Sequence, residues 1–348
     1  MSELLAGLKI DHVATPRLRT AVLVDERHDG EPVVFVHGNV SSSLFWQESI
    51  LALPDGFRGI APDLRGFGES ETAPVDATRG LGDFADDLYS LLDTLDIDRA
   101  HFVGWSMGGG IVMRILLERP EMVASLTLVS PVSPYGFGGT KGASGEPVTA
   151  DGAGAGGGSA NPDFVAALAA GDRGDDSPTS PRNVLNGAYF ANEFRSPLEE
   201  TFLDSMLTTK VGDDNYPGDA TGSENWPGFA PGTRGVLNTM VPGVHDVSGI
   251  VGVSPKPPIL WVHGSKDVIV SDASMFDLAT LGRMDVVPGW PGEDACPPQP
   301  MVTQTRAVLD DYAAAGGSYR EVELDCGHSA MVERPDEFQA ALAQVLRG

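Results

Sequence analysis

The chain has 348 residues and a formal net charge of -26, from 49 acidic and 23 basic residues. Nucleic acid and an anionic membrane surface would both repel so acidic a chain, so neither is an expected partner. Two cysteines, Cys296 and Cys326, are too few for a disulfide framework, and whether they pair stays open. No C-x-x-C pattern or histidine cluster indicates a metal site.

The first residues, 1–9, lack the basic start and the long apolar centre of a secretion signal. No later run approaches the length of a membrane span. A cytoplasmic location is therefore expected. Further along, apolar residues recur at helical spacing from Leu81 to Leu95, which predicts a helix that packs against a sheet.

Residues 100–110 contain the chemically most informative pattern. A short apolar strand, 100–105, leads into Ser106, which is flanked by Gly104 and Gly108 and followed by a helical pattern that stops at Pro120. This G-x-S-x-G arrangement is typical of a nucleophile elbow. Because the turn is tight, the two glycine positions must lack side chains. We predict that Ser106 is a nucleophile.

A serine hydroxyl needs a general base, and the base needs a carboxylate that orients it. Residues 258–264 read as a buried strand that delivers Asp267 just beyond its carboxyl end. Residues 319–324 alternate like a strand and are followed by His328. The sequence therefore predicts Asp267 as the acid and His328 as the base.

Competing acids and histidines have weaker contexts. Asp272 and Asp277 both follow the apolar run after Asp267. His37 and His263 each precede a glycine at a strand end, where a structural hydrogen bond is the expected role, and His245 has no strand context.

The order Ser106, Asp267, His328 resembles that of the α/β-hydrolase superfamily and differs from the orders in chymotrypsin and subtilisin. Residues 33–39 look like the superfamily's third strand and oxyanion loop, and 60–70 look like its D-x-R-G-x-G-x-S turn. The similarity covers roughly residues 20–130 and 255–348. It implies a mostly parallel eight-stranded sheet flanked by helices.

More than a hundred residues without a good strand separate the predicted sixth strand, 125–130, from the seventh at Ile259. The resemblance implies that this segment is a largely helical and irregular cap. The expected division is a core of residues 1–131 and 255–348, with a cap of residues 132–254.

The resemblance also implies an oxyanion hole. Its donors are the backbone N–H of Met107 and that of Asn39, with Val40 as the neighbouring alternative. Four residues are expected to contact the substrate: Val40, Trp105, Tyr135 and Trp290.

By resemblance, the expected protein is a serine hydrolase that needs no cofactor. It would cleave a carboxylic ester or lactone of a small, fairly hydrophobic molecule through an acyl-enzyme, because a lid that excludes water favours an apolar substrate. Alternatives are a cofactor-independent perhydrolase or haloperoxidase, a carbon–carbon bond hydrolase, an amidase or peptidase, and a non-catalytic receptor of the same fold.

Overall fold

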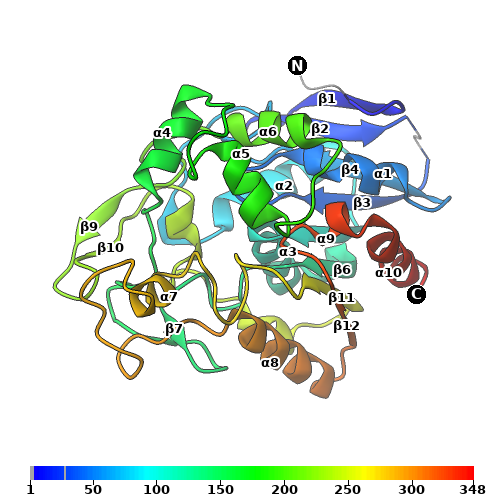
Figure 1. Ribbon diagram of the computed structural model, residues 1–348. Helices are drawn as coiled ribbons and strands as arrows, with labels where there is room; N and C mark the ends of the chain where they lie inside the picture. The colour runs from blue at the N-terminus through cyan, green and yellow to red at the C-terminus, as the bar shows by residue number, and fades with distance from the viewer. Residues whose placement is uncertain (1–3, 27–28) are drawn as a thin grey trace.

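The computed structural model describes residues 4–26 and 29–348. Within them, eight strands form one sheet in the order β1-β2-β4-β3-β5-β6-β11-β12 (Figure 1). Strand β2 runs antiparallel to both β1 and β4, and the other neighbouring strands of this sheet are parallel. The predicted α/β-hydrolase fold is confirmed. The strands are β1 Leu8–Ala14, β2 Arg19–Asp25, β3 Glu31–Val36, β4 Phe57–Pro62, β5 Ala100–Trp105, β6 Val123–Val129, β11 Ile259–Gly264 and β12 Tyr319–Leu324.

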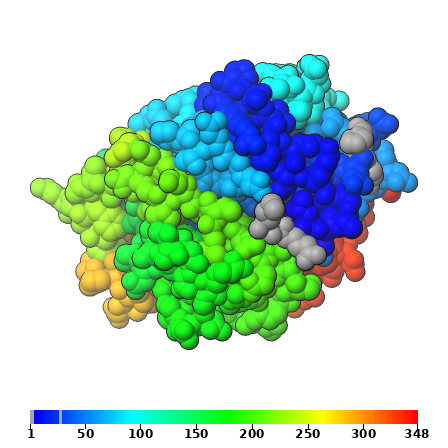
Figure 2. Space-filling view, turned by 90° about the horizontal axis from the view of Figure 1, so that it is seen from above, coloured from blue at the N-terminus to red at the C-terminus, as the bar shows by residue number. Residues whose placement is uncertain are grey.

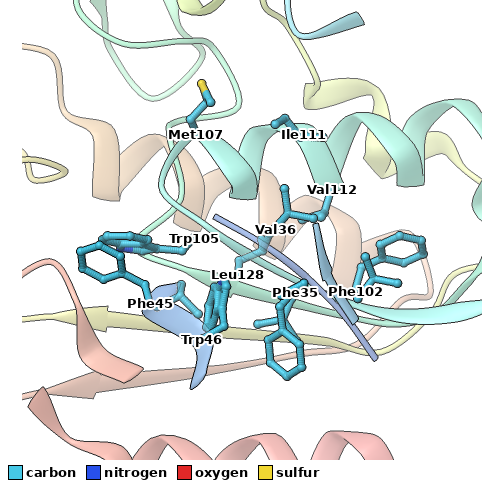
Figure 3. Close-up of a cluster of buried hydrophobic side chains, with 14 of the residues drawn as sticks. Phe35, Val36, Phe45, Trp46, Phe102, Trp105, Met107, Ile111, Val112 and Leu128 are labelled. Carbon is cyan, nitrogen blue, oxygen red and sulfur yellow. The ribbon is translucent and has the colours of Figure 1, made fainter. Parts of the chain in front are cut away.

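The central strands are buried on both faces, which explains their nearly continuous apolar sequences. Every residue of β5 is buried. Figure 3 shows Ile111 and Val112 on one side of this layer, with Phe35 and Trp46 pointing to the other. The sheet therefore holds the residues at its strand ends on a rigid support.

Helices cover both faces of the sheet. On one face α3 packs against β3, β5 and β6 and beside α2, while α8 packs against β12. On the other face α1 packs against β2 and β4, and α10 packs against β6 and β11. The helix predicted from Leu81 is α2, which buries Phe84, Leu88 and Leu91 as its spacing requires. These helices are α1 Gln47–Leu51, α2 Gly82–Thr94, α3 Met107–Glu118, α8 Met301–Ala314 and α10 Pro335–Arg347.

Short helical turns join these elements. They are η1 Ser43–Trp46, η2 Ala77–Arg79, η3 Pro120–Met122, α7 Leu278–Arg283 and α9 Ala330–Glu333. Within residues 4–26 and 29–348, no helix has the length and apolar character that crossing a membrane requires.

Residues 132–254, called the insertion below, connect β6 to β11. Their helical pieces α4, α5 and α6 gather at one end of the molecule, coloured green in Figure 1. Figure 2 shows that this green surface adjoins the blue surface of the N-terminal strands. The insertion contains α4 Pro162–Ala170, α5 Pro181–Val184, η4 Leu185–Tyr189, α6 Glu199–Leu207, η5 Leu237–Met240, η6 Ser248–Gly252 and the short strands β7 Thr140–Lys141, β8 Glu146–Pro147, β9 Ala220–Gly222 and β10 Phe229–Pro231.

Candidate active site

Ser106 stands at the sharp turn between β5 and α3. Its backbone angles, φ 56° and ψ -120°, lie in a region that costs a non-glycine residue about 1–3 kcal/mol. Neighbouring strands hold it there. The Ser106 N–H donates to the Val129 carbonyl at 3.0 Å, and the Val132 N–H donates to the Ser106 carbonyl at 3.0 Å.

The two glycines of the elbow have the role predicted for them. A Cβ on Gly104 would lie 2.4 Å from the Gly108 carbonyl oxygen. A Cβ on Gly108 would lie 2.2 Å from the Val36 carbonyl oxygen, at the end of β3. Helix α3 can therefore start against β3 and β5 only because neither residue has a side chain.

His328 and Asp267 form a buried pair. The imidazole Nδ1 lies 2.8 Å from Asp267 Oδ2, and both side chains are at most 2% exposed. The N–H groups of Ile269 and Val270 donate to Asp267 Oδ1 at 2.8 and 3.0 Å, which fixes the carboxylate. Because the carboxylate accepts the proton of Nδ1, the lone pair of a neutral His328 is on Nε2.

Trp105 connects this pair with the elbow. Its indole N–H donates to the His328 carbonyl at 3.0 Å, and its ring lies 5.5 Å from the imidazole ring between centroids. Since Trp105 directly precedes Ser106, this contact brings the carboxyl end of β5 next to the histidine loop. The Ser106 hydroxyl has no hydrogen bond of its own within the described residues. Catalytic hydrogen bonds of this kind are often long until substrate binds.

The competing acids have other partners. Asp272 accepts the N–H groups of Val302 and Thr303 at the start of α8. Asp277 caps α7 and accepts the Gln299 N–H at 2.8 Å. Asp267 is thus the acid that the structure pairs with His328.

The loop after β3 lies directly against the nucleophile. A Cβ on Gly38 would be 2.9 Å from Ser106 Cβ. The Val40 N–H is occupied, since it donates to Asn39 Oδ1 at 3.0 Å. The N–H groups of Asn39 and Met107 have no acceptor within residues 4–26 and 29–348. Of the two alternatives for the second oxyanion donor, the geometry favours Asn39.

His37 supports this loop from below. Its Nδ1 lies 2.7 Å from the Gly38 carbonyl oxygen, and its Nε2 accepts the Leu64 N–H at 2.9 Å. Burial lowers the pKa of His37 to about 4, so the ring is neutral and donates from Nδ1. His37 therefore has the structural role that its sequence context indicated.

The turn after β4 supports the same loop. The Asp63 carboxylate accepts the N–H groups of Ser43 and Glu69, each at 2.8 Å. Burial raises the pKa of Asp63, while these hydrogen bonds oppose the shift. A Cβ on Gly68 would lie 2.0 Å from the carboxylate, which explains the glycine in the D-x-R-G-x-G-x-S turn.

The four expected substrate contacts divide into two pairs. Trp105 directly precedes Ser106 and contacts His328, and Val40 lies in the loop that packs against Ser106, but both are about 2% exposed or less. Tyr135 instead packs against Gly145, and its hydroxyl faces Ser248. Trp290 packs on Gly282 and donates to the Cys296 carbonyl at 2.8 Å. None of these contacts of Tyr135 and Trp290 involves Ser106.

Two residues near His328 had no assigned role in the sequence interpretation. Tyr189 of the insertion lies 6.2 Å from the His328 ring and 5.7 Å from the Trp105 ring, between centroids. Glu333 accepts the Gly327 N–H, one residue before His328, at 2.9 Å. An acidic residue within the short apolar run 330–333 was the available signal for Glu333.

Cys296 and Cys326 are both buried free thiols. The described part of the chain holds no group of three or more His, Cys, Asp or Glu side chains placed to bind a metal ion.

The sheet order is that of an α/β-hydrolase-fold protein. So is the arrangement of a serine at a strand-turn-helix, with a buried acid and histidine after later strands. A sequence model of the alpha/beta hydrolase fold family matches residues 31–141. The chain therefore has the α/β-hydrolase fold.

Among curated proteins, the chain is 29% identical to carboxylesterase YbfK of Bacillus subtilis (strain 168) over 124 residues, 36% of this chain and 42% of that protein. It is 37% identical to 2-hydroxymuconate semialdehyde hydrolase of Pseudomonas sp. (strain CF600) over 103 residues, 29% of this chain and 36% of that protein. The chain thus spans only about two fifths of the length of the curated relatives it matches. The solved enol-lactonase of Burkholderia xenovorans LB400 has a similar fold, with a TM-score of 0.60 and 18% identity, covering 97% of this chain and 100% of that one.

Proposed function

We propose that the protein is a serine hydrolase that cleaves a carboxylic ester or lactone of a small, fairly hydrophobic molecule. The observation that carries the proposal is the buried His328–Asp267 hydrogen bond of 2.8 Å, on a loop that Trp105 joins to the Ser106 elbow. The sequence and fold relatives described above as a carboxylesterase and an enol-lactonase support the same reaction class.

The proposed mechanism uses Ser106, His328 and Asp267 together. Ser106 Oγ attacks the substrate carbonyl carbon while His328 Nε2 takes its proton, and Asp267 stabilises the resulting imidazolium. The N–H groups of Met107 and Asn39 donate to the oxyanion. His328 then protonates the leaving oxygen, and water releases the acyl group by the reverse sequence.

A fluorophosphonate probe tests the nucleophile. We expect covalent labelling of the wild type and no labelling of Ser106→Ala. Ser125→Ala is a matched control, because Ser125 Oγ lies 2.7 Å from a ring nitrogen of buried His101, whose other ring nitrogen contacts Glu31. Ser125 is 1% exposed and lies within β6, not at a strand-to-helix turn, so its loss should leave labelling intact. Unlabelled, folded wild type would instead favour a non-catalytic receptor.

A substrate panel tests the reaction class. Esters, lactones, amides and vinylogous ketones are compared by kcat/KM in wild type and Ser106→Ala. The proposal expects esters or lactones to give the highest value, because alkoxide leaving groups need the least protonation. Preference for a vinylogous ketone would favour the carbon–carbon hydrolase alternative, which the 2-hydroxymuconate semialdehyde hydrolase relative supports.

A further inference from the structure

One turn of the insertion contacts both loops that complete the candidate active site. At its start, the Tyr189 hydroxyl donates to the carbonyl oxygens of Asn39 and Val40 at 2.9 and 3.2 Å. Tyr189 is 7% exposed, and its ring stands edge-on to Trp105 at 84°. Tyr189, which is 149 residues from Val40 in the sequence, therefore binds the oxyanion loop from the side of the insertion.

The same turn is tied to the histidine loop. The Ala191 N–H donates to Glu333 Oε2 at 2.8 Å, while the Gly327 N–H donates to Oε1 at 2.9 Å. One buried carboxylate thus joins the insertion to the residue before His328. The backbones also touch, since a Cβ on Gly327 would lie 2.6 Å from the Ala191 nitrogen.

The oxyanion loop needs such support because its backbone is strained. Val40 is β-branched and has φ 46°, a left-handed angle that such residues rarely adopt. A conformation of this kind costs about 1–3 kcal/mol and persists only where its surroundings fix it. The Tyr189 hydroxyl binds the carbonyl oxygens of the two peptides on either side of the strained Val40 Cα. The first of these carbonyls belongs to Asn39, whose own N–H lies one peptide earlier in the same loop.

We propose that Tyr189 is a positioning residue for the reaction proposed above, on which this inference rests. From the insertion side, its hydroxyl sets the oxyanion loop in the geometry that the transition state requires. Glu333 couples the same turn to the His328 loop. Docking of residues 189–191 therefore completes the active site, in addition to covering it.

The test compares Tyr189→Phe with Tyr312→Phe, a control variant that also loses a buried tyrosine hydroxyl. Tyr312 is 0% exposed and donates to the Pro257 carbonyl at 2.7 Å, at the opposite end of the sheet from the elbow. Tyr312→Phe therefore removes the same kind of hydrogen bond without touching the site. Both variants should lose similar thermal stability.

Two measurements separate positioning from stability. Amide hydrogen exchange should quicken in residues 38–43 of Tyr189→Phe and stay unchanged there in Tyr312→Phe. On the best substrate of the panel, kcat of Tyr189→Phe should fall about tenfold with little change in KM, because a misplaced donor weakens transition-state stabilisation. Glu333→Gln, which can accept only one of the two N–H groups, should quicken exchange in residues 189–191 and 326–329.

Equal exchange in residues 38–43 for Tyr189→Phe and wild type would overturn the inference, even in an active enzyme. So would a Tyr189→Phe variant whose kcat matches that of Tyr312→Phe. If the wild type cleaves nothing in the panel, the proposed function fails, and the exchange measurement still decides whether Tyr189 sets the loop.

Discussion

At the scale of single residues, close backbone packing restricts which amino acids the elbow can contain more than any polar contact does. Gly108 begins a helix, where alanine is ordinarily more stable than glycine by about 0.5–1 kcal/mol. Here a Cβ would lie 2.2 and 2.6 Å from the carbonyl oxygens of Val36 and His37, neither of which can move without disturbing β3 and its loop. Steric overlap therefore outweighs helix propensity.

We predict that Gly108→Ala lowers the free energy of unfolding by about 3 kcal/mol or more, as severe overpacking does. Urea denaturation measures the change. Gly252→Ala is the control, since a Cβ at Gly252 meets nothing within 4 Å, and it should shift stability by less than about 1 kcal/mol. Similar stabilities for the two variants would contradict the steric account.

Residue-scale features were also those most readily predicted from the sequence. The glycines flanking Ser106 satisfy a local steric demand, so their pattern carries the information by itself. Asp267 and His328 were found because parallel strands present their carboxyl ends at one edge of the sheet. Tyr189 was visible only as one of several aromatic residues in the insertion. Its partners lie about 150 residues away, and no local periodicity encodes such a contact.

At the scale of elements, an ion-pair cluster fastens the turn after β4 to helix α2. Arg65 binds Asp87 through two nitrogens at 2.6 and 2.7 Å and donates to the Pro74 carbonyl. The side chains of Arg65 and Asp87 are 6% and 8% exposed, so ion pairs replace water around both charges. Asp87 Oδ1 also accepts from Arg17 Nε at 2.7 Å. The D-x-R-G turn thus has an arginine because the bidentate geometry requires one.

Removing Asp87 leaves the positive charge of Arg65 buried without its bidentate carboxylate partner. We predict that Asp87→Ala destabilises the protein by about 3 kcal/mol in urea denaturation. The control Asp214→Ala removes a partner of Arg234 where both side chains are nearly half exposed, and it should cost less than about 1 kcal/mol. A small effect of Asp87→Ala would mean that Asp83, 3.3 Å from Arg65, suffices alone.

At the element scale, irregular segments are the hardest to predict from the sequence. Tyr135 and Trp290 lie in segments rich in glycine and proline, where chain direction depends on successive turns and not on a repeating pattern. In the structure Tyr135 faces Ser248 and Trp290 packs onto α7, and the substrate contacts expected of both stay predictions. The sheet and its helices were predictable because their periodicities reflect burial on defined faces.

At the scale of the whole molecule, buried histidines make stability depend on pH. Burial lowers the pKa of both His37 and His245 to about 4. The unfolded chain binds their protons near pH 6.5, so stability is fully present above that pH and is lost as pH falls toward 4. Asp277 acts in the opposite sense, since burial raises its pKa to about 6 and stability falls as pH rises through that value.

His245→Leu isolates one of these contributions. His245 Nε2 is buried without a partner within the described residues, beside Asp246 and Arg114. Moving from about pH 8 to about pH 5 should destabilise the wild type by about 2 kcal/mol more than the variant. Urea titrations at the two pH values measure this difference, and Asp277 contributes equally to both proteins. Parallel pH profiles would show that His245 is not neutral in the folded state.

The contact of residues 189–191 with two loops of the sheet constrains protein engineering. Exchanging the segment between β6 and β11 for that of another superfamily member preserves strand register, because β6 and β11 already pair side by side. Such a chimera would nevertheless need a hydroxyl aimed at the carbonyls of positions 39 and 40, and an amide aimed at the carboxylate of position 333. Under the proposal for Tyr189, we expect a chimera without these groups to turn over its substrate more slowly.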